Sequence, residues 1–413
     1  MEQRYEFGFT MAINDSTCAF QLNPFSDSTT IGLTTFKRKI RMTTSKQLFS
    51  TISSKGELSL SLVDVDIPKP KPHEVVVKIE AAPINPSDMW PMFGPADLRA
   101  AIFSNDDKTL KAPLHEGMLS RVKPRIDRTL PIGNEGAGTV VAAGDSPQAQ
   151  ALIGKTVAVL SGAMYSEYCC VPVQACIVHN EGTTAKQAAS SFVNPLTALC
   201  MIETMRQEGH KALVHTAAAS SLGIMLNKVC IQADIDLVNI VRKQEQVDIL
   251  KALGAKYVLN SSDENFKKDL YKAIDATGAT LAFDAIGGGT LVSDILTAME
   301  AVGSKDARGF NTYGSAENKQ VYIYGGLDFS PSVLNRAYGM TWGIGGWLLM
   351  RSLGKLEVTK VLAMHKRVAD EINTTFALDF SDEISLEEAM QPANIARYNA
   401  KKTGEKFLIN PSK

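Results

Sequence analysis

The segment VHTAAASSLG, residues 214–223, joins a predicted buried strand to a predicted helix. Small side chains at such a turn let a phosphate approach the free N–H groups at the positive end of the helix. Gly223 would allow the helix to pack closely on the strand. The first two glycines of the usual dinucleotide-binding fingerprint are absent, so the string alone also suits any tight strand-to-helix turn. The candidate phosphate-binding residues are Ala218, Ala219, Ser220, Ser221, Leu222 and Gly223.

The sequence around this turn alternates between apolar runs and segments with helical spacing. The predicted strands are residues 212–217, 237–241, 256–260, 279–286 and 321–324, and the predicted helices are residues 222–233, 247–253, 266–274 and 290–301. Strands alternating with helices of this length indicate parallel βαβ units. In that context the turn is best explained as a dinucleotide-binding turn of a doubly wound α/β domain.

Two cations follow the second of these predicted strands. Arg242 and Lys243 occupy the place where an NAD enzyme usually has an acidic residue for the ribose hydroxyl. A guanidinium and an ammonium suit a 2′-phosphate, which favours NADPH as cofactor, although a solvated pair at a strand end is the alternative. Ser261, at the end of the third strand, would add a hydroxyl contact or instead cap a helix together with Glu264.

The N-terminal half predicts a different kind of domain. Leu58, Leu60 and Leu62 alternate with serines, as in a half-buried strand, and prolines punctuate residues 68–72. Further short strands with glycine and proline turns predict a mostly β domain up to about residue 180. Residues 97–128 show no period, and we expect an insertion loop that partly covers a cleft.

Composition bounds the remaining possibilities. With 43 Lys plus Arg and 44 Asp plus Glu in 413 residues, the net charge is −1, which argues against a nucleic-acid partner. No apolar run is long enough to span a membrane, the most apolar stretch being Tyr338–Met350. Six scattered cysteines indicate a reduced, cytoplasmic protein. Residues 1–42 lack a period and are expected to be a disordered extension, with a mitochondrial address as the minor alternative.

The order of these segments resembles the medium-chain dehydrogenase/reductase superfamily. The resemblance rests on APINPSD at 82–88, PIGNEGAGTVVAAG at 131–144, YSEYCCVP at 165–172, AASSFVNPLTA at 188–198, DAIGG at 284–288, YGG at 324–326 and GEKFLI at 404–409. It implies a Rossmann domain, residues 183–347, inserted into a GroES-like catalytic domain, residues 43–182 and 348–413. It further implies a homodimer acting on a small molecule.

Within that superfamily the chain departs from the zinc alcohol dehydrogenases. Where those enzymes have Gly-His-Glu, this chain has Gly133-Asn134-Glu135. Where they have a cysteine before the polar pair of the first turn, this chain has Asn85-Pro86-Ser87. Their four clustered cysteines are also missing, and the six histidines show no ligand spacing. We therefore predict that no zinc is bound and that the chain is similar to the zinc-free quinone oxidoreductase and enoyl reductase branch.

The resemblance also assigns candidate site residues. Asn85, Asn194 and Thr197 would line the nicotinamide, although each asparagine would equally suit an ordinary turn. Further cofactor contacts would come from Tyr165, Gly287, Tyr324, Gly325 and Lys406. Trp90 and Phe93 would stack on a flat substrate, or would simply be core aromatics.

The expected reaction is hydride transfer from NADPH to a quinone or enone. A 2-enoyl thioester reductase is the alternative, but that branch uses a tyrosine shortly after the first turn, where residues 89–93 read MWPMF. A catalytically silent, NADPH-binding interaction protein is a third possibility, because Ser220 and Ser221 replace the usual turn glycines.

Overall fold

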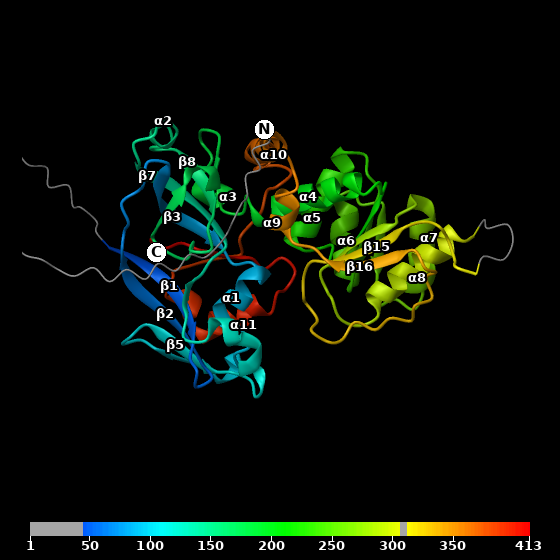
Figure 1. Ribbon diagram of the computed structural model, residues 1–413, viewed down its shortest axis with the longest axis horizontal. Coiled ribbons are helices and arrows are strands. Elements are labelled where there is room, and N and C mark those ends of the chain that lie inside the picture. Colours follow the sequence, from blue (N-terminus) through cyan, green and yellow to red (C-terminus); the bar gives the residue numbers. More distant parts are fainter. Residues whose placement is uncertain (1–43, 306–311) are drawn as a thin grey trace, which may run out of the picture. The chain divides into compact units, whose positions relative to one another are not determined.

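The computed structural model describes residues 44–305 and 312–413, so the predicted extension at 1–42 lies outside the described residues. The described chain forms three β-sheets with helices packed against them (Figure 1). Two of the sheets are built mainly from the N-terminal part of the chain, and the third is a parallel sheet built from residues 213–346. This is the predicted α/β class, with a Rossmann-type parallel sheet and a GroES-like β domain.

The parallel sheet contains six strands in the order β13-β12-β11-β14-β15-β16. Its strands are β11 (Leu213–Thr216), β12 (Leu237–Val241), β13 (Tyr257–Asn260), β14 (Leu281–Asp284), β15 (Lys319–Ile323) and β16 (Trp342–Gly346). The crossover helices are α5 (Ser221–Gln232), α6 (Gln244–Ala252), α7 (Phe266–Thr277) and α8 (Leu291–Gly303). The strand order reverses between β11 and β14, which is where ligands bind in open α/β sheets.

Strand β16 is an addition to the predicted strands. It lies inside the apolar stretch 338–350 and pairs in parallel with β15, where Trp342 faces Lys319 and Gly346 faces Ile323. Three of its five residues are glycines, which have low strand propensity, so the pattern predicts no strand. The backbone pairing with β15 is what makes it a strand.

The first β domain sheet has five strands in the order β4-β5-β2-β1-β6. These are β1 (Thr44–Ile52), β2 (Glu57–Asp66), β4 (Ile102–Ser104), β5 (Thr109–Pro113) and β6 (Thr129–Pro131). In β2, Leu58 and Leu60 are fully buried, as their alternation with serines predicts. Strand β1 is not predicted from the sequence, because serines fill two of its buried positions, Ser45 and Ser50.

The expectation of an insertion loop at residues 97–128 is wrong. Strands β4 and β5 form a hairpin that extends this sheet through β2, and short 3₁₀ helices occupy Leu98–Ala100 and Met118–Arg125. In β5, Leu110 and Ala112 are buried and Lys111 is exposed, which is a strand alternation. That alternation covers too few residues to show in the sequence pattern.

The second β domain sheet brings the C-terminus back to the N-terminal half. Its strands are β3 (Glu74–Pro83), β7 (Glu135–Ala143), β8 (Thr156–Leu160), β9 (Tyr168–Pro172), β10 (Cys176–Val178), β17 (Asp382–Ile384) and β18 (Phe407–Ile409). Strand β18 runs antiparallel to β3, with Leu408 opposite Pro83. This pairing places Lys406, just before β18, close to the first turn after β3.

The remaining helices connect or cover the sheets. They are α1 (Met89–Phe93), α2 (Pro147–Gln150), α3 (Ala185–Ala188), α4 (Val193–Gln207), α9 (Leu349–Leu353), α10 (Val358–Glu371) and α11 (Pro392–Asn399), with 3₁₀ helices at Pro86–Asp88, Val173–Ala175 and Glu388–Met390. Figure 1 shows α9 and α10 beside α4. Buried residues of α4, α5 and α10 share one hydrophobic cluster with β11 and β14.

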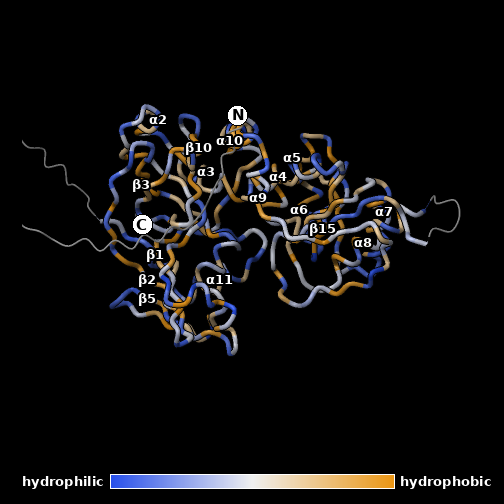
Figure 2. Tube along the Cα trace, in the orientation of Figure 1, coloured by the Kyte–Doolittle hydropathy of each residue, from blue (hydrophilic) through white to orange (hydrophobic). Residues whose placement is uncertain are grey.

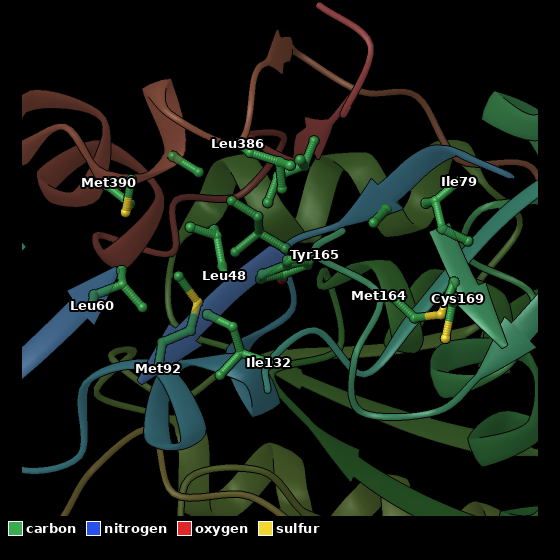
Figure 3. Close-up of a cluster of buried hydrophobic side chains, with 14 of the residues drawn as sticks. Leu48, Leu60, Ile79, Met92, Ile132, Met164, Tyr165, Cys169, Leu386 and Met390 are labelled. Carbon is green, nitrogen blue, oxygen red and sulfur yellow. The ribbon is translucent and has the colours of Figure 1, made fainter. Parts of the chain in front are cut away.

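The β domain has a hydrophobic core of its own. In Figure 3, Tyr165 lies among Leu48, Ile132 and Met92 in that core. Figure 2 shows hydrophobic residues along the strands around β3 and β15, where burial stabilises the sheets. Within the described ranges, no helix is long and apolar enough to cross a membrane.

Candidate cofactor and active site

The turn between β11 and α5 is held by a hydrogen bond to the neighbouring strand β12 and by a cap on α5. Ala217 has a left-handed backbone with φ of 51°, and the Ala218 N–H donates to the Ile240 carbonyl at 3.2 Å. The Ser220 hydroxyl caps α5 by accepting from the Gly223 N–H at 3.2 Å. A Cβ at Gly223 would lie 2.2 Å from the Ala218 carbonyl oxygen, so this position requires glycine.

Three amide donors of this turn remain available. Within residues 44–305 and 312–413, the N–H groups of Ala219, Ser221 and Leu222 have no hydrogen-bond acceptor. They lie at the start of α5, a 12-residue helix, whose dipole places partial positive charge there. This combination fits a pyrophosphate group, since free amides at a helix N-terminus bind anions.

A buried carboxylate joins this turn to the loop after β14. The Thr216 hydroxyl donates to Asp284 Oδ1 at 2.6 Å and accepts from the Ala285 N–H at 2.9 Å. Asp284 also accepts from the Gly287 N–H at 2.8 Å, and both Thr216 and Asp284 are fully buried. The sequence analysis names Gly287 but not Thr216 or Asp284. Thr216 and Asp284 are each a polar residue at the carboxyl end of a mostly apolar parallel strand. Binding sites form at this edge of such sheets, so the pattern could have identified both residues.

The loop after β15 places a tyrosine against a histidine of β11. The Tyr324 hydroxyl lies 2.7 Å from His215 Nε2, and the two rings stack with centroids 5.8 Å apart. His215 is fully buried, and this burial lowers its pKa to about 3, so the imidazole is neutral at physiological pH. The next residue, Gly325, lies so close to the Ala285 carbonyl oxygen that a Cβ would be 2.8 Å from it. His215 is absent from the predicted site, though a histidine inside an apolar strand is its signal.

The two cations after β12 are exposed at the strand end. Gln246 Oε1 accepts from the N–H of Arg242 at 3.1 Å and from the N–H of Lys243 at 3.2 Å. In the part of the chain that the structure describes, neither cation forms an ion pair. The Ser261 N–H donates to the Val241 carbonyl at 2.8 Å. Helix α7 begins only at Phe266, so the alternative role of Ser261 as a helix cap is not observed.

A second group of candidate residues forms a buried polar cluster, which comprises Asn85, Asp88, Glu135 and Lys406. The Asn85 Nδ2 donates to Glu135 Oε1 at 2.9 Å, and the Asn85 N–H donates to Asp88 Oδ2 at 2.7 Å. The Lys406 ammonium donates to Asn85 Oδ1. All four side chains are at least nine-tenths buried. The cluster therefore joins three segments that are far apart in the sequence.

Glu135 connects this cluster to the start of α4. Its Oε2 accepts from the N–H groups of Phe192 and Val193, each at 2.9 Å. Helix α4 carries Asn194, which is partly buried, and Thr197, whose hydroxyl donates to the Val193 carbonyl at 2.5 Å. One carboxylate therefore links Asn85 to the start of α4, the helix that carries both candidates, and sequence spacing does not reveal this connection.

Burial and charge oppose each other inside the buried polar cluster. Burial raises the pKa of Asp88 to about 6, although backbone N–H groups and Lys406 act against the shift. Burial also raises the pKa of the Glu135 carboxyl. The pKa of Lys406 falls to about 8 because burial disfavours its charge more than the two carboxylates favour it.

Three of the predicted site residues lie outside the turn after β11 and outside the buried polar cluster. Tyr165 is fully buried, and its hydroxyl donates to the Pro83 carbonyl at 3.1 Å, inside the core shown in Figure 3. Phe93 is 2% exposed and stacks on Tyr398, as a core aromatic does. Trp90 is 49% exposed and remains accessible to a ligand. A direct ligand contact by Tyr165 or Phe93 would require that side chain to leave the core.

Potential metal ligands do not gather in the described ranges. Among residues 44–305 and 312–413, no three His, Cys, Asp or Glu side chains are arranged to hold a metal ion. The cysteines of this part of the chain are free thiols. The donors in the buried polar cluster are an amide, an ammonium and two carboxylates, and the ammonium would repel a cation.

Comparison with known proteins agrees with this geometry. The family model for the alcohol dehydrogenase GroES-like domain matches residues 71–186. A crystal structure assigned as an NADPH:quinone reductase from Mesorhizobium loti superposes with a TM-score of 0.67 at 25% identity, covering 89% of this chain and 99% of that chain. These similarities are those of the medium-chain dehydrogenase/reductase superfamily.

Curated members of the superfamily match over shorter stretches. Prostaglandin reductase-3 of Mus musculus is 29% identical over 173 residues, which cover 41% of this chain and 44% of that protein. The mitochondrial enoyl-[acyl-carrier-protein] reductase of Rattus norvegicus is 26% identical over 229 residues, covering 52% of each. The matches therefore span about half the length of these curated relatives.

Proposed function

We propose that the protein is an NADPH-dependent oxidoreductase that reduces a quinone or an enone without zinc. The observation that carries the proposal is the exposed pair Arg242 and Lys243, which forms no ion pair within the described residues. The pair follows β12, the strand next to the free amides after β11. An NADPH molecule carries a pyrophosphate and a 2′-phosphate that suit these two donor sets.

In this proposal, each part of NADPH is bound by a different group of residues. The amides at Ala219, Ser221 and Leu222 hold the pyrophosphate, and Arg242 and Lys243 hold the 2′-phosphate, with Ser261 nearby. The loop residues Gly287, Tyr324 and Gly325 border the nicotinamide riboside, and Asn85, Asn194 and Thr197 line the nicotinamide. When bound, the reduced nicotinamide supplies a hydride.

The buried polar cluster supplies electrostatics and alignment in this proposal. Hydride addition to a quinone or enone develops negative charge on the carbonyl oxygen, and preorganised positive potential stabilises it. Lys406, with its pKa of about 8, keeps most of its charge at neutral pH. Glu135 orients Asn85 and the start of α4 together, so both sides of the nicotinamide pocket keep one geometry. Water supplies the final proton.

The cofactor assignment is tested by Arg242→Ala. We expect NADPH binding to weaken by about 1.5–3 kcal/mol, the value of a charged hydrogen bond, and NADH binding to stay the same. Lys251→Ala removes an exposed cation from the last turn of α6, the helix that begins two residues after Arg242, and serves as the matched control. Calorimetric titration of both cofactors measures the difference, and equal losses for NADPH and NADH would refute the assignment.

The reaction is tested by NADPH oxidation with a panel of quinones and enones. We expect turnover with at least one of them. If the folded protein binds NADPH but oxidises it with none of them, the third hypothesis, a silent NADPH-binding protein, replaces this proposal.

A 2-enoyl thioester reductase is the second candidate. The match to the rat enoyl reductase favours it, as does the Asn-Pro-x-Thr-Ala run at 194–198. Residues 89–93, in α1, contain no tyrosine that would act as the acid. We therefore expect little turnover of crotonyl thioesters, and rapid turnover would reverse the preference.

We further propose that the protein is a cytoplasmic homodimer that pairs through β16. Among the described strands, β16 pairs only with β15, so its other edge is open. Met340 and Leu348, on either side of it, are 73% and 64% exposed. Exposed apolar side chains beside an open strand edge favour self-association. Sedimentation analysis should show a dimer, and Ile344→Pro should yield monomers.

A further inference from the structure

The turn at residues 400–404 comes from the C-terminal part of the chain and meets the end of β12. Thr403 Oγ1 accepts a hydrogen bond from Gln246 Nε2 at 2.7 Å. The other end of the same Gln246 side chain, Oε1, accepts from the N–H groups of Arg242 and Lys243. One amide side chain therefore holds the turn 400–404 against the two residues proposed to bind the 2′-phosphate.

The turn 400–404 also contains a cation without an ion pair among the described residues, two residues before Thr403. Lys401 is exposed, has a left-handed backbone with φ of 50°, and forms no ion pair with any residue that the structure describes. Its neighbour Lys402 differs, because its ammonium lies 3.7 Å from Glu405 Oε1. A left-handed backbone in a lysine is strained, and such strain is often kept at binding sites.

The same short segment also reaches the other end of the proposed cofactor site. Three residues after Thr403, the Lys406 ammonium donates to Asn85 Oδ1 in the buried polar cluster. The Lys406 N–H donates to the Ser381 hydroxyl at 3.1 Å. This hydrogen bond holds the segment against the residue that precedes β17. Residues 401–406 thus connect the cations after β12 with the residues proposed to line the nicotinamide.

Cations that share one site without a counter-charge repel one another, and a bound anion removes that repulsion. We propose that the turn 400–404 completes the 2′-phosphate site, with Lys401 as a third cation. Gln246, through Thr403, is a positioning residue that holds the turn beside Arg242 and Lys243. This inference rests on the proposed NADPH site and adds a specificity-determining element to it.

The test uses two probes that differ only in the phosphate concerned, adenosine 2′,5′-bisphosphate and adenosine 5′-monophosphate. Both are titrated calorimetrically into the full-length protein. Lys401→Gln should weaken binding of the bisphosphate about tenfold, as expected for one lost charged hydrogen bond, and leave the monophosphate unchanged. Lys402→Gln, the matched control, removes a cation already paired with Glu405 and should change neither affinity.

A second variant tests the anchor. Thr403→Val keeps the side-chain shape but removes the hydroxyl that Gln246 contacts, and it should weaken only the bisphosphate, by about threefold. A purely structural role would shift both probes equally. The monophosphate affinity also shows that each variant is folded.

The outcomes separate this inference from the proposal beneath it. If the wild-type protein binds both probes equally, the 2′-phosphate site itself is refuted, and the inference falls with it. If the wild-type protein prefers the bisphosphate but Lys401→Gln behaves like Lys402→Gln, only the role of the turn is overturned.

Discussion

The turn after β11 and the buried polar cluster serve neighbouring parts of one proposed site but are built in opposite ways. The turn uses small side chains, free amides and one local cap, all within residues 217–223. The buried polar cluster uses charged side chains from three distant segments, and Lys406 lies 321 residues from Asn85. A site can thus combine a local cradle, whose donors are backbone amides, with a long-range network of charged side chains.

The largest expected effect is in the buried polar cluster. Glu135→Ala removes the acceptor of the Phe192 and Val193 amides and one of the two buried carboxylates that favour the charge of Lys406. We expect a loss of about 4 kcal/mol in the free energy of unfolding, because buried donors lose their acceptor and a buried charge loses compensation. Urea denaturation measures it, with Glu135→Gln as the milder variant. A loss below 1 kcal/mol would show that the cluster contributes little to the fold.

In the turn after β11, the position most constrained by close contacts is Gly223. Gly223→Ala would place a Cβ 2.2 Å from the Ala218 carbonyl oxygen, and α5 would have to shift. We expect a loss of about 3 kcal/mol, because overpacking against backbone is poorly relieved. Thermal unfolding should show it, and NADPH binding should weaken as the amides move. An unchanged melting temperature would mean that α5 moves freely.

The pH dependence of stability should separate the two regions, because the turn contains no titratable side chain and the cluster contains Asp88. Its folded pKa of about 6 lies above the unfolded value of 3.8. The folded state therefore binds more protons between these values, and stability falls as pH rises through about 6. Relative to Asp88→Asn, the wild type should lose about 2 kcal/mol between pH 4 and 7. Parallel pH curves for the two proteins would contradict this sign.

The smallest expected effect is at Ala217, whose left-handed backbone suits glycine better than alanine. Ala217→Gly should raise the free energy of unfolding by about 0.5 kcal/mol, since the relief of strain exceeds the added chain entropy. The substitution is the reverse of Gly223→Ala, six residues away. Differential scanning calorimetry of both variants should therefore give shifts of opposite sign.

Local patterns predicted the parallel sheet well but the β domain less completely. Strand β12 has the predicted bounds, because a fully buried parallel strand is a continuous apolar run. Strand β1 escaped prediction because Ser50 occupies a buried position, where its hydroxyl donates to the Met92 carbonyl at 2.7 Å. The β4–β5 hairpin escaped because its strands are short and are completed by pairing with β2.

The candidate site divides in the same way. Arg242, Gly223 and the small residues of the turn were named from spacing alone, because a strand, a turn and a helix follow one another in the chain. Tyr165 and Phe93 were named by family resemblance, yet they lie in the hydrophobic core. His215, Asp284 and Gln246 were missed because each acts through a partner that is far away in the sequence.

The amino-acid sequence by itself determined the alternation of strands and helices, the phosphate-binding turn and the cations after β12, since all of these depend on neighbouring residues. Only the tertiary structure decided that Asn85, Glu135 and Lys406 share one buried cluster and that Thr403 meets Gln246. The physical reason is that burial and hydrogen-bond partners arise when strand β18 pairs with β3. No local pattern encodes that pairing, because its two strands lie at opposite ends of the described chain.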